Sequence, residues 1–117
     1  MRIVNDALLN QADYEKFGAV KSMMAMYRSL ERSACRGDTV AHSIFVDIKE
    51  AIYSGVLTPY QLEIVEMYFL SGHTQDDVAM NLGIGRQRVH ARVNAAVKNV
   101  QKVLNSGDLY RGGGKNP

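Results

Sequence analysis

Apolar residues recur every three or four positions along most of the chain, which is the spacing of a helix with one buried face. In residues 12–36 this spacing predicts one long helix, and Gly37 follows as its stop. Asp38 can cap a second helix, whose apolar positions lie four residues apart and which ends near Gly55. Because β-branched residues nowhere alternate with polar ones for long, we expect an all-α fold of four to five helices without a sheet.

Three further helices are predicted in the C-terminal half. Thr58 followed by Pro59 is a helix start with proline at the first helical position, and that helix extends to about residue 70. Thr74 can cap a short helix that Gly83 ends, and the last helix begins near Arg86. The expected core of this half consists of Leu62, Val65, Phe69, Val78, Leu82, Ile84, Val89 and Val93.

A short helix, a glycine-containing turn and a second helix with a polar outer face make up a helix-turn-helix. Valines fix the inner face of the last helix, so its polar residues are expected on the side that would face DNA. Arginine can bind guanine, glutamine and asparagine can bind adenine, and cations toward the flanks can hold backbone phosphates. The predicted DNA-binding residues are Arg86, Gln87, Arg88, His90, Ala91, Arg92, Asn94 and Lys98.

Charge is distributed unevenly along the sequence. Residues 58–82 contain four carboxylates and no lysine or arginine, whereas residues 83–117 contain seven lysines and arginines and a single aspartate. Lys98 and Lys102 extend the basic side of the last helix beyond its first turns. A basic C-terminal third favours a polyanionic partner, and double-stranded DNA is the partner that the helix-turn-helix indicates.

Other classes of function find little support in the residues. The three histidines and the lone Cys35 are scattered, so we expect no metal site and no cofactor. There is no nucleophile motif and no phosphate-binding glycine loop, so we expect no enzyme. Neither an export signal nor an apolar run long enough for a membrane span is evident, and we therefore expect a cytoplasmic protein.

Residues 57–104 resemble the region-four helix-turn-helix of bacterial sigma factors and of the small sigma-like regulators carried by phages. The residues that carry this resemblance are Thr58, Gln61, Val65, Tyr68, Phe69, Gly72, Thr74, Val78, Ala79, Leu82, Gly83, Arg86, Arg88, Val89, Ala95 or Ala96, and Val97. It implies that the last helix reads a promoter element and assigns Arg86, Gln87, Arg88, His90 and Ala91 to the DNA face. Gly85 departs from the family's serine or threonine cap, Gln87 from its glutamate and Ala91 from its glutamine.

The sequence divides into residues 1–56, a helical segment for packing, oligomerisation or partner contact; residues 57–105, the DNA-binding unit; and residues 106–117, a flexible tail. The leading hypothesis is a sequence-specific, sigma-like transcription regulator that binds promoter DNA and contacts RNA polymerase. One alternative is a DNA-packaging protein like the small terminase subunit of phages, in which the long N-terminal helix builds a homo-oligomeric ring. Another is a protein-binding adaptor of RNA polymerase or of a sigma factor.

Overall fold

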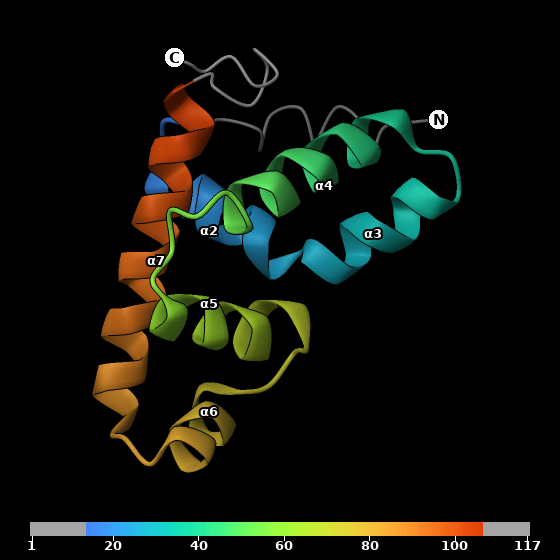
Figure 1. Cartoon of the computed structure of the whole chain (residues 1–117). Helices are drawn as coiled ribbons and strands as arrows, with labels where there is room; N and C mark the ends of the chain where they lie inside the picture. Colours follow the sequence, from blue (N-terminus) through green and yellow to red (C-terminus); the bar gives the residue numbers. More distant parts are fainter. Residues whose placement is uncertain (1–13, 107–117) are drawn as a thin grey trace.

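The computed structural model describes residues 14–106, in which helices joined by turns and loops are present and no strand is. The all-α prediction is confirmed for this part of the chain, and Figure 1 shows the arrangement. The elements in chain order are α2 (Phe17–Ala25), α3 (Tyr27–Cys35), α4 (Thr39–Ile52), α5 (Pro59–Val65), the π-helical turn η1 (Glu66–Leu70), α6 (Gln75–Leu82) and α7 (Arg86–Ser106).

The prediction of one long helix over residues 12–36 is wrong. The first of these residues lie outside the described part, α2 begins at Phe17, and the helix breaks at Met26 (φ −93°, ψ 10°). The bend lets α2 pack against α7 while α3 lies along α4. A bend at a single residue leaves the three-and-four spacing of apolar positions intact, so the sequence pattern does not reveal it. The described part accordingly holds six α-helices rather than four to five.

The predicted helix starts are confirmed, and each is fixed by hydrogen bonds between residues close together in the sequence. A side-chain oxygen of Asp38 accepts a hydrogen bond from the Ala41 amide at 3.0 Å. Thr58 accepts one from the Gln61 amide, and the Gln61 side chain accepts one from the Thr58 amide, both at 3.1 Å. This reciprocal pair and Pro59 at the first helical position fix where α5 begins.

The helix predicted over residues 58–70 has the expected length, but its last turn is wider than an α-helical turn. In η1 the amide of Ser71 donates to the carbonyl of Glu66, five residues earlier, at 2.9 Å. Gly72 follows with φ +80°, a conformation that a side chain rarely adopts. A Cβ atom on Gly72 would also lie 2.8 Å from Nη1 of Arg28, so α3 approaches this loop closely.

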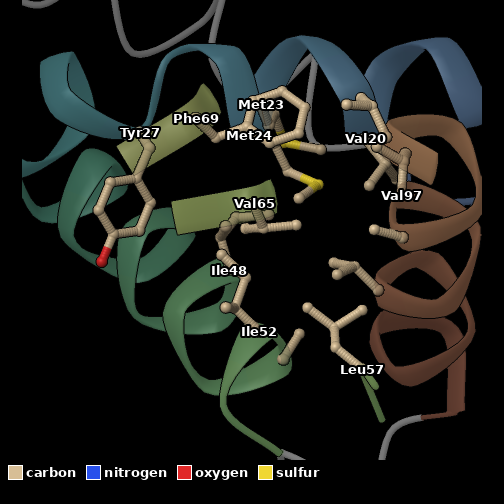
Figure 2. Close-up of a cluster of buried hydrophobic side chains, with 14 of the residues drawn as sticks. Val20, Met23, Met24, Tyr27, Ile48, Ile52, Leu57, Val65, Phe69 and Val97 are labelled. Atoms are coloured by element: carbon tan, nitrogen blue, oxygen red, sulfur yellow. The ribbon is translucent and has the colours of Figure 1, made fainter. Parts of the chain in front are cut away.

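The buried core is one cluster to which α2, α3, α4, α5, η1, α6 and α7 all contribute. Figure 2 shows part of this cluster. Of the core predicted for the C-terminal half, Val65, Phe69, Val78, Val89 and Val93 are buried, and Leu62, Leu82 and Ile84 are partly buried against the cluster. Met23 and Met24 are fully buried beside Val65, which makes them core residues and not a surface for a partner.

Because the core is continuous, residues 14–56 and 57–106 share buried side chains across the expected boundary at residue 57. The boundary itself stays a prediction, and the predicted tail lies beyond the described residues except for Ser106, which ends α7. The helix α7 runs along one side of the molecule, and α6, α5, α2 and α4 all pack against it. No helix among the described residues is long and apolar enough to cross a membrane.

Candidate nucleic-acid interface

Local hydrogen bonds shape the turn between α6 and α7. Thr74 accepts a bond from the Asp77 amide at 3.0 Å, and Asp77 accepts one from the Thr74 amide at 3.3 Å, which starts α6. Gly83 ends α6 in the left-handed conformation (φ 67°, ψ 34°), and the amide of Ile84 donates back to the carbonyl of Ala79 at 3.1 Å. The predicted short helix, glycine turn and second helix are therefore present.

Gly85 occupies the position just before α7. Its carbonyl accepts the amides of Arg88 and Val89, both at 3.1 Å, so the backbone already forms the first helical bonds. Glycine offers no side-chain oxygen to the free amides of the first turn. A Cβ atom at Gly85 would meet nothing within 4 Å.

The inner face of α7 is formed by residues that are completely buried. They are Val89, Val93, Ala96, Val97 and Val100, each with 0% exposure. They hold α7 against the other helices along most of its length, and they fix which residues can face outward.

Two other helices border the inner face of α7, one on each side. On the α5 side, the guanidinium of Arg92 lies 4.4 Å from the ring centroid of Tyr60, and Asn99 donates to the side chain of Gln61 at 3.0 Å. On the α2 side, Asn94 accepts a hydrogen bond from Nζ of Lys21 at 2.9 Å. Gln101 lies on that side too and donates to the carbonyls of residues 14 and 15.

At 100° per residue, the positions opposite the buried face form an outward line along α7. Side chains on this line are all exposed, and it carries three cations and two alanines. Its members are Gln87, Arg88, Ala91, Ala95, Lys98 and Lys102. Because alanine side chains are short, the floor of a DNA groove could approach the helix backbone in the middle of this line. Of the eight residues predicted to bind DNA, Gln87, Arg88, Ala91 and Lys98 lie on this line.

The other four predicted residues make contacts within the protein. Arg86 pairs with Asp76 of α6, with Nε and the carboxylate oxygen 3.4 Å apart. His90 and Asn94 are joined by a 3.2 Å hydrogen bond between Nε2 and Nδ2. Arg92 is half-buried on Tyr60, and its Nη1 atom is buried without a hydrogen-bond partner among residues 14–106. To contact DNA, these side chains would have to leave their present partners or bind from the edge of the exposed surface of α7.

Sequence reasoning missed two residues of this surface. Ala95 lies on the outward line, but its methyl side chain has no polar group that would indicate a DNA contact. Lys21 lies beside α7 although 73 positions separate it from Asn94, and only the packing of α2 brings them together. No local signal in the sequence could have indicated that contact.

Comparison with known families agrees with this geometry. Residues 55–102, less than half of the chain, match the family model described as Sigma-70, region 4. The matched segment runs from just before α5 through most of α7, and it is similar to the helix-turn-helix of this family, which is a DNA-binding and not a catalytic family. The resemblance predicted for residues 57–104 is thus confirmed. The chain has no match among curated proteins or solved structures.

Proposed function

We propose that this protein is a sequence-specific DNA-binding transcription regulator of the sigma-like type, which reads promoter DNA in the major groove with α7. The observation that carries the proposal is the outward line of α7, which is exposed, basic and directly continuous with a helix-turn-helix. An α-helix fits the major groove, where each base pair presents a distinct set of hydrogen-bonding groups. The matched family supports DNA as the ligand.

The roles of the residues follow from their positions along α7. Gln87, on the outward line, and Arg86, in the same first turn, are the proposed base-reading side chains. Arg88 and Lys98 are charged and exposed, and they are the proposed phosphate contacts. Ala91 allows close approach and can touch a thymine methyl group.

His90, Arg92 and Asn94 are proposed as members of the same interface that bind from its edges. His90 and Asn94 lie on the α2 side, and Arg92 lies on the α5 side. Each must exchange a contact within the protein for one with DNA, so each contributes less binding free energy than its hydrogen-bonding capacity suggests.

RNA polymerase is the proposed protein partner, and the cytoplasm of a bacterial or phage-infected cell is the proposed location. Both proposals follow from the resemblance to region four of sigma factors. The packaging alternative depended on one long N-terminal helix, and the break at Met26 removes that support. No observation in the structure favours a DNA-free adaptor over a DNA-binding regulator.

Selection of bound duplexes from a random DNA pool tests the proposal. We expect a recovered motif, and we expect the logarithm of affinity to fall with the logarithm of salt concentration by roughly 0.9 per phosphate contact. Gln87→Ala should weaken the selected duplex while binding to a scrambled duplex stays almost unchanged, because a base contact is lost. Lys98→Ala is the matched control and should weaken both duplexes alike. Absence of any enriched motif, with binding insensitive to salt, would refute the proposal.

A further inference from the structure

An open hollow of about 690 Å³ lies beside the first turns of α7, away from the outward line. Its walls come from α2, η1, the loop into α6, the first residues of α6 and the start of α7. The residues that line it are Ala25, Tyr68, Phe69, Gly72, His73, Thr74, Gln75, Asp76, Arg86 and His90. A smaller hollow of about 310 Å³ shares Gln75, Arg86 and His90 with it and also reaches Gln87. The larger hollow therefore adjoins the proposed reading face.

Two cations from the N-terminal helices lie near this hollow, although neither is among the residues that line it. Lys21 of α2 donates to Asn94, and Asn94 is bonded in turn to His90 in the hollow wall. Arg28 of α3 places its Nη1 atom beside Gly72, another wall residue. Neither cation forms an ion pair among residues 14–106.

The described lining of the hollow has no net charge, because its cation, Arg86, pairs with its carboxylate, Asp76, and the positive charge comes from Lys21 and Arg28 beside the hollow. Lys21, Arg28 and Arg86 contribute three full charges, and His73 and His90 add two further donors. Among residues 14–106, Asp76 is the only carboxylate in the lining, and it pairs with Arg86 at 3.4 Å. A groove with these cations near it that opens beside a DNA-reading helix is suited to a backbone phosphate.

We propose that this hollow holds the sugar-phosphate strand that borders the major groove entered by α7, with Lys21 and Arg28 as its phosphate contacts. The inference rests on the proposed function and extends it, because α2 and α3 lie outside the segment that matches Sigma-70, region 4. Residues 14–36 are then part of the DNA-binding surface and not only support for it. The proposed DNA-binding surface is therefore wider than the surface of the helix-turn-helix alone.

The test compares Lys21→Gln, Arg28→Gln and the double variant with the unmodified protein, using the full chain and the selected duplex. Glutamine removes the charge at residue 21 but keeps a polar side chain with an N–H donor. We expect each single variant to reduce the magnitude of the salt slope by about 0.9 and the double variant by about 1.8. Specific and scrambled duplexes should lose affinity by the same factor, because phosphates carry no sequence information.

Lys49→Gln is the matched control, because Lys49 is an exposed cation on α4 that lies over the ring of Phe45. It should leave the salt slope unchanged. Ethylation of individual phosphates supplies a second measurement: positions at which ethylation blocks the unmodified protein should cease to do so for the double variant. Thermal melting confirms that each variant is folded.

The two hypotheses fail in different ways. If the unmodified protein binds DNA with a motif, but Lys21→Gln and Arg28→Gln behave like Lys49→Gln in both measurements, the inference is wrong and the proposed function stands. If the unmodified protein binds no DNA, the proposed function fails and the inference falls with it.

Discussion

The ion pair between Arg86 and Asp76 makes a quantitative prediction about DNA binding. Its Nε and carboxylate oxygen are 3.4 Å apart, and the two side chains are 70% and 68% exposed. A pair this exposed contributes about 0.2–1 kcal/mol. If Arg86 must leave Asp76 to bind a base, Asp76→Asn removes that cost and should tighten binding about 1.4- to 5-fold. Arg86→Ala alone should weaken the selected duplex by about 1–3 kcal/mol.

A double-mutant cycle measured by fluorescence anisotropy separates this pair from the general repulsion between Asp76 and DNA. That repulsion is present with and without Arg86, so it cancels, and the coupling between the two substitutions reports the ion pair. Asp77→Asn is the matched control: it removes an adjacent carboxylate that bonds the Thr74 amide and not Arg86, so it should show no coupling to Arg86→Ala. Weaker binding by Asp76→Asn, or purely additive effects of Asp76→Asn and Arg86→Ala, would refute the reasoning.

Three further predictions concern the fold and are checked by denaturation or titration. Gly85→Ser should stabilise the protein by a few tenths of a kcal/mol or more, because the added hydroxyl oxygen can cap α7 and a Cβ at this position meets no other atom. Gly83→Ala should instead cost about 1–2 kcal/mol, because alanine rarely adopts φ 67°. If both variants changed the free energy of unfolding equally, both interpretations would be contradicted. Val93→Ala should cost about 2 kcal/mol, since the side chain is completely buried, and an unchanged urea midpoint would argue against this core. Partial burial of Tyr53, its hydrogen bond to Glu66 and the charge of Glu66 raise the pKa of Tyr53 to about 12. The stabilisation from neutral Tyr53 is therefore present below pH 10 and is lost as pH rises through 12. Ultraviolet titration should show that Tyr53→Phe lacks the tyrosine ionisation near pH 12, and loss of an ionisation near pH 10 instead would be inconsistent with the hydrogen bond.

Sequence reasoning succeeded where the determinants of structure are local. The starts of α4, α5 and α6 depend on Asp38, Thr58 and Thr74, each of which bonds an amide three residues further on. The turn between α6 and α7 depends on Gly83 in a left-handed conformation. Patterns of this kind involve a few neighbouring residues, so they can be recognised without knowledge of the tertiary structure.

The break at Met26 could not be predicted on the same basis. No proline or glycine lies at the bend, and Met26 keeps hydrogen bonds to the carbonyls of both Ser22 and Met23. The different partners of α2 and α3, namely α7 and α4, account for the change of direction. The contact of Lys21 with Asn94 is a consequence of that bend, and the composition of the candidate interface therefore depends on tertiary packing.

The dual role of α7 determines how substitutions in it must be interpreted. Its inner face completes the core, while Arg92 and Asn94 on its two sides contact α5 and α2. A change at Arg92 or Asn94 can therefore tilt the helix and weaken DNA binding without removing any DNA contact. Gln87 and Lys98 lie on the outward line, where substitution leaves the packing of α7 intact. Loss of binding at these two positions identifies a contact with DNA, whereas loss at Arg92 or Asn94 requires a matching measurement of stability before it can be assigned.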